Sequence, residues 1–127
     1  LYKTGLTNQD ISRELDELRL DRTPIICDSA EPKSIEELHR LGHNVKPSKK
    51  GPDSIRLGID IMKRHKLFVL KDSLNAQKEF RNYRWEVDKN GVQLNKPIDN
   101  NNHIIDAIRY VCINRIGTPY SGKYFIS

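Results

Sequence analysis

Short apolar runs alternate with helix-forming segments along this 127-residue chain. The runs Ile25–Cys27, Val45 and Leu67–Leu70 are predicted strands, and helices are predicted before, between and after them. Strands that alternate with helices usually join into a mainly parallel sheet covered by helices, because each parallel connection needs a crossover. The alternation therefore predicts a mixed α/β fold, and the length of the chain favours one core.

Helix-start residues place the predicted helices. Thr7 with Asp10 has the spacing of a capping box, in which two side chains satisfy backbone N–H groups of the first turn. Ser34 and Glu37 have the same spacing, and Gly42 fits the left-handed residue that closes that second helix. Further helices are predicted to begin at Asp53 or Ser54, at Ser73, and at Asn101 or Asn102, the last one running to about Asn114 before an irregular tail from about residue 117.

A β-hairpin is predicted at residues 83–94. Tyr83, Trp85 and Val87 alternate with polar side chains, which is the period of a strand. Asn90-Gly91 follows them, and both residue types tolerate the positive φ angles of a two-residue type I′ turn. The hairpin could contact DNA as a wing or form an edge of the sheet, and we favour the edge.

The chain is basic, with a formal charge of +5 and a pI near 9.3. This charge suits a polyanionic partner such as nucleic acid, although it could also serve solubility alone. Lys49 and Lys50, beside Gly51, could contact DNA phosphates, and a pair of solvated lysines is an equally good interpretation. No apolar run approaches the roughly 20 residues that span a bilayer, so we expect a soluble, cytosolic protein without a membrane partner.

Both cysteines lie in apolar runs. Cys27 follows Ile25-Ile26, and Cys112 stands between Val111 and Ile113. Free cysteine in such a setting usually behaves as a small buried hydrophobe. We therefore expect neither a disulfide nor a zinc site.

Asp106 is the most informative residue for function. His103 and Asp106 lie at i and i+3, so the last predicted helix carries an imidazole and a carboxylate on one face. The neighbouring positions are mostly apolar, where an ionised carboxylate needs a cation or several donors to compensate its charge. A metal ion would do so, and so would an ion pair with Arg109. Spacing alone weighs these interpretations equally, and His103 could likewise simply cap or pack.

Asp28 is the second candidate, because it ends a predicted buried strand and ligands of open α/β sheets bind beyond the carboxyl ends of strands. A turn or cap residue before Pro32 is the commoner role of such an aspartate. Asp28 and Asp106 together could bind Mg²⁺ or Mn²⁺, and two such ions about 4 Å apart can hydrolyse phosphodiesters. At least one more carboxylate is then needed. Glu31 is the nearest, although a solvated loop acid is its commoner role.

Two stretches resemble motifs of the nuclease domain of phage terminase large subunits. Residues 25–38 (IICDSAEPKSIEEL) are similar to its second acidic motif, and residues 102–110 (NHIIDAIRY) are similar to its closing motif. The likeness covers the chain to about residue 115, and the two motifs in this order are specific. Residues between them that follow the order usual in the family are Lys50-Gly51, Ser54-Ile55, Gly58, Glu79, Tyr83 and Trp85.

The resemblance implies a ribonuclease H-like fold, a mixed sheet flanked by helices that lacks its first strands here and carries an added β-hairpin. It implies cleavage of double-stranded DNA by two metal ions, Mg²⁺ or Mn²⁺, with Asp28 and Asp106 as ligands and His103 as a ligand or proton handler beside them. It also implies an ATPase motor domain upstream, a small terminase subunit and a portal as partners, and the cytoplasm of a bacterial host.

The chain departs from the family in two respects. The first acidic motif of the family lies on a strand ahead of Leu1, and no G-x-x-x-x-G-K-[ST] loop is present. Residues 1–127 are therefore expected to be a partial nuclease domain that binds metal weakly and cuts DNA poorly. The alternatives are another ribonuclease H-like nuclease of integrase, transposase or resolvase type, selective for junctions or ends, and a non-catalytic module that docks DNA or protein.

Overall fold

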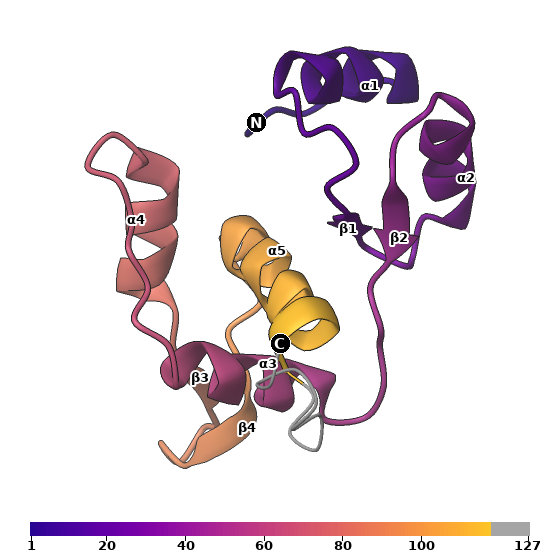
Figure 1. The fold of residues 1–127 in the computed structure, drawn as a ribbon. Helices are drawn as coiled ribbons and strands as arrows, with labels where there is room; N and C mark the ends of the chain where they lie inside the picture. Colours follow the sequence, from indigo (N-terminus) through magenta and orange to yellow (C-terminus); the bar gives the residue numbers. More distant parts are fainter. Residues whose placement is uncertain (118–127) are drawn as a thin grey trace, which may run out of the picture. The chain divides into compact units, whose positions relative to one another are not determined.

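The computed structural model describes residues 1–117, and the predicted tail after Pro119 lies outside them. The chain forms two compact units, residues 1–48 and residues 49–127, each of which is described by itself. The first unit holds α1 (Asn8–Glu17), β1 (Ile25–Cys27), α2 (Pro32–Arg40) and β2 (Val45–Pro47) (Figure 1). The second holds α3 (Ser54–Lys63), α4 (Leu74–Asn82), β3 (Trp85–Val87), β4 (Gln93–Pro97), α5 (His103–Val111) and the π-helical turn η1 (Cys112–Ile116).

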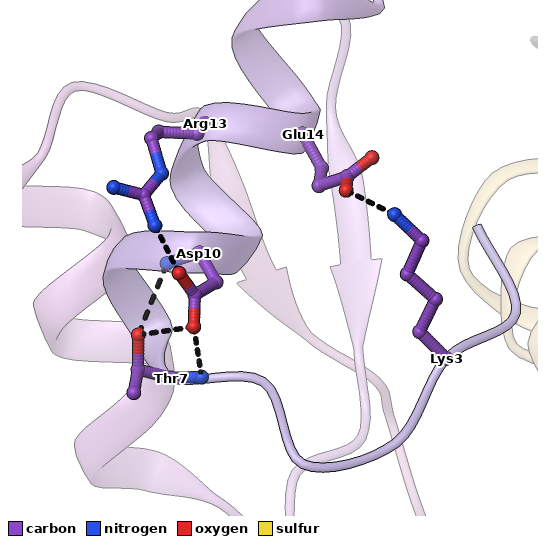
Figure 2. Close-up of polar contacts among 5 residues, drawn as sticks. All are labelled: Lys3, Thr7, Asp10, Arg13 and Glu14. Atoms are coloured by element: carbon purple, nitrogen blue, oxygen red, sulfur yellow. Dashed lines mark hydrogen bonds and ion pairs between the residues drawn. The ribbon is translucent and has the colours of Figure 1, made fainter.

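The predicted capping box at the start of α1 is confirmed. The Thr7 side chain accepts a hydrogen bond from Asp10 N, and Asp10 Oδ2 accepts one from Thr7 N at 2.9 Å (Figure 2). The backbone and hydroxyl hydrogen bonds from Thr7 hold the pKa of Asp10 below its usual value of 3.8. Arg13, one turn along the helix, adds an ion pair to the same carboxylate. Local side chains thus fix where α1 begins.

Both strands of the first unit are where the sequence predicts them. They pair in parallel, with Ile25 opposite Val45 and Cys27 opposite Pro47. The helix between them begins at Pro32, so the prediction that Ser34 caps it is wrong. Proline is favoured in the first helical turn because its missing N–H has no partner there anyway, and Ser34 then lies inside the helix. The prediction for Gly42 is confirmed, since its φ is +99°.

Polar contacts join α1 to α2 and to the loop that follows. Asn8 Nδ2 donates to Glu37 Oε2 at 2.7 Å, and the hydroxyl of Ser12 lies 2.7 Å from His43 Nε2. Ser12 is buried, so this hydrogen bond satisfies a hydroxyl that would otherwise be costly to bury.

The core of the second unit lies between α3, α5 and η1. Its buried members are Ile61, Met62, Ile105, Cys112 and Ile113. Phe80 and Tyr83 from the end of α4, together with Ile108, pack against them. The predicted burial of Cys112 is confirmed; Cys27 is partly buried, both thiols are free, and burial raises the pKa of each.

The prediction of a strand at Leu67–Leu70 is wrong. The segment follows α3 as irregular backbone, with Phe68 82% and Leu70 77% exposed. An apolar, β-compatible sequence becomes a strand only where a partner strand bonds to it, and the described residues supply none there. Residues 1–117 therefore contain a parallel pair, β1 with β2, and an antiparallel pair, β3 with β4, in place of one mainly parallel sheet.

The predicted hairpin is confirmed, but not its turn. β3 and β4 pair in antiparallel register, with Val87 opposite Gln93. Gly91 alone of the two central residues has a positive φ, of +80°. The Asp88 carboxylate accepts hydrogen bonds from Asn90 N at 2.8 Å and Val92 N at 2.9 Å, and so closes a wider loop. Among the described residues no helix is both long and apolar enough to cross a membrane.

Candidate functional site

Asp106 lies on α5 with its side chain 28% exposed. Arg109 Nη2 donates to Asp106 Oδ1 at 3.0 Å, so the ion pair weighed as one interpretation of the sequence is present. Within residues 1–117 this is the one side-chain hydrogen bond that the Asp106 carboxylate accepts. Asp106 is thus partly neutralised while it keeps contact with solvent.

Arg109 is held in place by packing. Its side chain is 7% exposed and crosses Gly58 of α3, where an added Cβ would lie 2.2 Å from Arg109 Cγ. The guanidinium also lies 5.1 Å from the centre of the Tyr110 ring, and the buried Nε has no hydrogen-bond partner among the described residues. A buried cation held this firmly needs the negative charge of Asp106 beside it.

Tyr83 lies close to the same pair. Burial raises the pKa of its phenol, the negative charge of Asp106 raises it further, and Arg109 opposes this by lowering it. The Tyr83 hydroxyl is buried and has no hydrogen-bond partner within residues 1–117. Tyr83 is therefore a neutral neighbour of Asp106.

Glu79 is a functional candidate that the sequence alone shows only as one residue in the order usual for the family. Its side chain comes from α4, is 2% exposed, and accepts hydrogen bonds on Oε2 from Ile104 N at 2.8 Å and Ile105 N at 3.1 Å. These are backbone N–H groups of the first turn of α5, which helix geometry leaves without partners. The sequence does hold a signal for Glu79. Its carboxylate lies on the helix face that the apolar residues Ala76 and Phe80 mark, because it is three positions after Ala76.

A pocket of about 300 Å³ opens beside Asp106. Four of its eight lining residues carry carboxylate or amide oxygens, and one of these four, Glu86, is paired with Lys96 at 3.0 Å. Carboxylate and amide oxygens are donors that hard divalent cations prefer, so the chemistry of this wall fits one. The residues that line the pocket are Ile55, Glu86, Lys96, Pro97, Asp99, Asn102, Asp106 and Arg109.

Asp28 follows the last residue of β1 in the first unit and is exposed. Its Oδ1 accepts a hydrogen bond from Ala30 N at 3.0 Å, which is the turn role considered from the sequence. Glu31 shares this turn, with its N–H 3.4 Å from Asp28 O, and occupies the N-cap position of α2 without a side-chain cap bond. The turn therefore brings two exposed acids together.

The remaining candidates are exposed. His103 is the first residue of α5 and lies three positions before Asp106, as predicted. Lys49 and Lys50 begin the second unit, and Lys49 N donates to Asn114 Oδ1 at 3.0 Å, which ties this basic loop to η1. Residues 1–117 contain no group of three or more His, Cys, Asp or Glu side chains that could hold a metal ion.

The mixed α/β architecture, with one acid after a strand and another on a helix face, matches that of a ribonuclease H-like nuclease domain. A family model described as "Terminase RNAseH like domain" matches residues 1–112. The chain belongs to this family, and the predicted family and fold class are confirmed.

One relative and one solved structure similar to the chain come from bacteriophage SPP1. The large subunit of terminase from Bacillus phage SPP1 is 40% identical over 92 residues, which are 68% of this chain and 21% of that protein. The crystal structure of the g2p (large terminase) nuclease domain from bacteriophage SPP1 with bound Mn is similar at 31% identity and a TM-score of 0.76. That likeness covers 87% of this chain and 64% of the SPP1 domain, so the chain spans less than two thirds of either relative.

Proposed function

We propose that this chain acts in a metal-dependent endonuclease of a viral DNA-packaging terminase, which hydrolyses phosphodiester bonds of double-stranded DNA. The observation that carries the proposal is the likeness, over 87% of the chain, to a terminase nuclease domain whose crystal structure contains Mn. The basic charge of the chain, +5, suits a DNA substrate.

Two aspartates are the proposed metal ligands, for Mg²⁺ or Mn²⁺. Asp106 presents a partly exposed carboxylate beside a pocket that Glu86, Asp99 and Asn102 also line, and Asp28 presents an exposed one just after β1. Bound in a pair, such ions activate water and neutralise the leaving oxygen of a phosphodiester. Residues 49–117 do not complete such a site alone, and Glu31 is a further candidate acid.

His103 and the two lysines have separate proposed roles. The His103 imidazole, exposed on the first turn of α5, can bind a cation or move a proton near neutral pH. Lys49 and Lys50 can contact phosphates of the duplex and so hold it without reading its sequence. An ATPase motor domain in the same polypeptide, a small terminase subunit and a portal are the proposed partners, in the cytoplasm of a bacterial host.

The proposal is tested by replacing each aspartate with its neutral isostere. In the polypeptide that includes the proposed motor domain, Asp28→Asn and Asp106→Asn are each expected to weaken Mn²⁺ binding, measured by electron paramagnetic resonance, and to abolish Mn²⁺-dependent nicking of supercoiled plasmid. Asp72→Asn, at an exposed turn in the second unit, is the matched control and keeps both properties. Nicking that persists in both variants overturns the proposal.

A non-catalytic docking role is the second candidate, because Asp106 already has a counter-charge in Arg109 at 3.0 Å. Under this alternative the protein binds duplex DNA with the same affinity with and without Mn²⁺. Asp106→Asn then leaves DNA binding unchanged while lowering stability. Loss of metal-dependent cleavage in that variant, with folding retained, decides for the nuclease.

A further inference from the structure

Glu79 makes an interaction between two helices that the proposed chemistry does not use. Glu79 is 2% exposed, and its Oε2 accepts hydrogen bonds from two backbone N–H groups in the first turn of α5, at 2.8 and 3.1 Å. The donors, Ile104 N and Ile105 N, stand between His103 and Asp106 in the sequence. The bonded turn is thus the one that carries both candidate side chains.

The start of α5 depends on this carboxylate. Asn102, in the N-cap position, makes no side-chain cap hydrogen bond, so α5 has no local cap of the usual kind. Ile105 is completely buried, so if the Glu79 carboxylate were removed, water could not take its place as the partner of Ile105 N. A negative charge at a helix N-terminus is also favoured by the helix dipole.

We propose that Glu79 is a positioning residue of the metal site, which holds the first turn of α5 and thereby sets the placement of His103 and Asp106. This inference rests on the proposed function. It assigns to α4 a role in the reaction that acts through the backbone of α5. Groups that orient metal ligands in this way affect metal affinity strongly, although they never touch the ion.

Two conservative substitutions separate geometry from charge. Glu79→Gln keeps the reach of the side chain and an oxygen for Ile104 N and Ile105 N, but removes the charge. Glu79→Asp keeps the charge but is one methylene shorter, so it withdraws the oxygen from both donors. If placement of the turn is what matters, Asp is the more harmful of the two.

The experiment measures the Mn²⁺ dissociation constant by electron paramagnetic resonance, below the melting temperature of every variant. We expect Glu79→Asp to raise it about tenfold or more, and Glu79→Gln to stay within about threefold of the parent. Ala76→Gly, which weakens α4 but keeps the Glu79 carboxylate, is the matched control and should leave the constant unchanged. The amide resonances of Ile104 and Ile105 should move in Glu79→Asp and not in Ala76→Gly.

Three results overturn the inference. The first is an unchanged Mn²⁺ dissociation constant in Glu79→Asp. The second is a larger rise of this constant in Glu79→Gln than in Glu79→Asp. The third is a rise in Ala76→Gly as large as that in Glu79→Asp. Asp106→Asn is measured in parallel. When it weakens Mn²⁺ binding and Glu79→Asp does not, the positioning role alone is wrong, whereas no change in Asp106→Asn overturns the proposed function as well.

Discussion

Arg109 Nη2 lies 3.0 Å from Asp106 Oδ1, one turn along the same helix, and this guanidinium is the cation that balances Asp106 within the described residues. A divalent ion bound by Asp106 would have to tolerate a positive charge beside it or displace it. The ion pair therefore links the stability of the second unit to its proposed affinity for metal.

Arg109→Met is expected to lower the free energy of unfolding by about 2 to 3 kcal/mol, because it leaves Asp106 without its counter-charge. This loss of stability is at the lower end of the range for breaking a buried ion pair, since the Asp106 side chain is 28% exposed and remains partly hydrated. Urea denaturation measures the loss. In the double variant with Asp106→Leu, the loss should be smaller than the sum of the two single losses.

The same variant should bind Mn²⁺ more tightly, by about threefold or more, because a like charge close to the proposed ligand is gone. Mn²⁺ should then raise the melting temperature of Arg109→Met more than that of the parent, since the stabilisation by a ligand grows with the logarithm of its affinity. Equal shifts in both proteins would show that Asp106 does not bind the ion.

Gly58→Ala is expected to destabilise the second unit by about 1 to 3 kcal/mol, the usual cost of forcing atoms into a packed interior. A Cβ at this position would lie 2.2 Å from Arg109 Cγ and 2.8 Å from its Cδ, so Arg109 must move. Gly51→Ala is the control, because a Cβ there meets nothing within 4 Å. A Gly58→Ala protein as stable as the control would mean that Arg109 does not cross α3 in solution.

The acid side of the stability curve should depend on Asp10. Hydrogen bonds from the Thr7 backbone and hydroxyl hold the folded pKa of Asp10 below 3.8, so its contribution to stability is present above that value. It is lost as the pH falls through the lower, folded pKa. Asp10→Asn should therefore flatten the dependence of unfolding free energy on pH below about 4, measured by urea denaturation at several pH values. Thr7→Ala should flatten it in the same way, and an undiminished slope in both variants would contradict the assignment.

The features that the sequence predicts correctly are those that neighbouring residues determine. Thr7 and Asp10 fix the start of α1 by themselves, and Gly42 closes α2 because its positive φ suits glycine. The segment Leu67–Leu70 fails as a strand because strand formation depends on a partner, which no local pattern encodes.

The candidate site follows the same division. His103 and Asp106 could be placed on one helix face from their spacing, since a helix has a fixed period. Glu79 could not be given its role, because its bonds to Ile104 N and Ile105 N join residues 25 and 26 positions apart. Contacts of this kind arise from packing, which brings α4 against α5 only once the core has formed.

Tyr83→Phe should leave the protein as stable as the parent near neutral pH, or slightly more stable. The Tyr83 hydroxyl is buried without a hydrogen-bond partner among residues 1–117, and an apolar ring of the same shape avoids the cost of desolvating it.

In the parent, burial and then the charge of Asp106 raise the folded pKa of Tyr83 above its usual value of 10.0. The unfolded chain therefore ionises this phenol first, so stability is unaffected by the titration well below pH 10.0 and declines as the pH rises from there toward the folded pKa. Urea denaturation between about pH 8 and 11 should show that decline in the parent and a smaller one in Tyr83→Phe, around the ordinary tyrosine pKa. Asp106→Asn should lower the pKa of Tyr83 in a spectrophotometric titration, and an unchanged value would place the carboxylate too far from the ring to act on it.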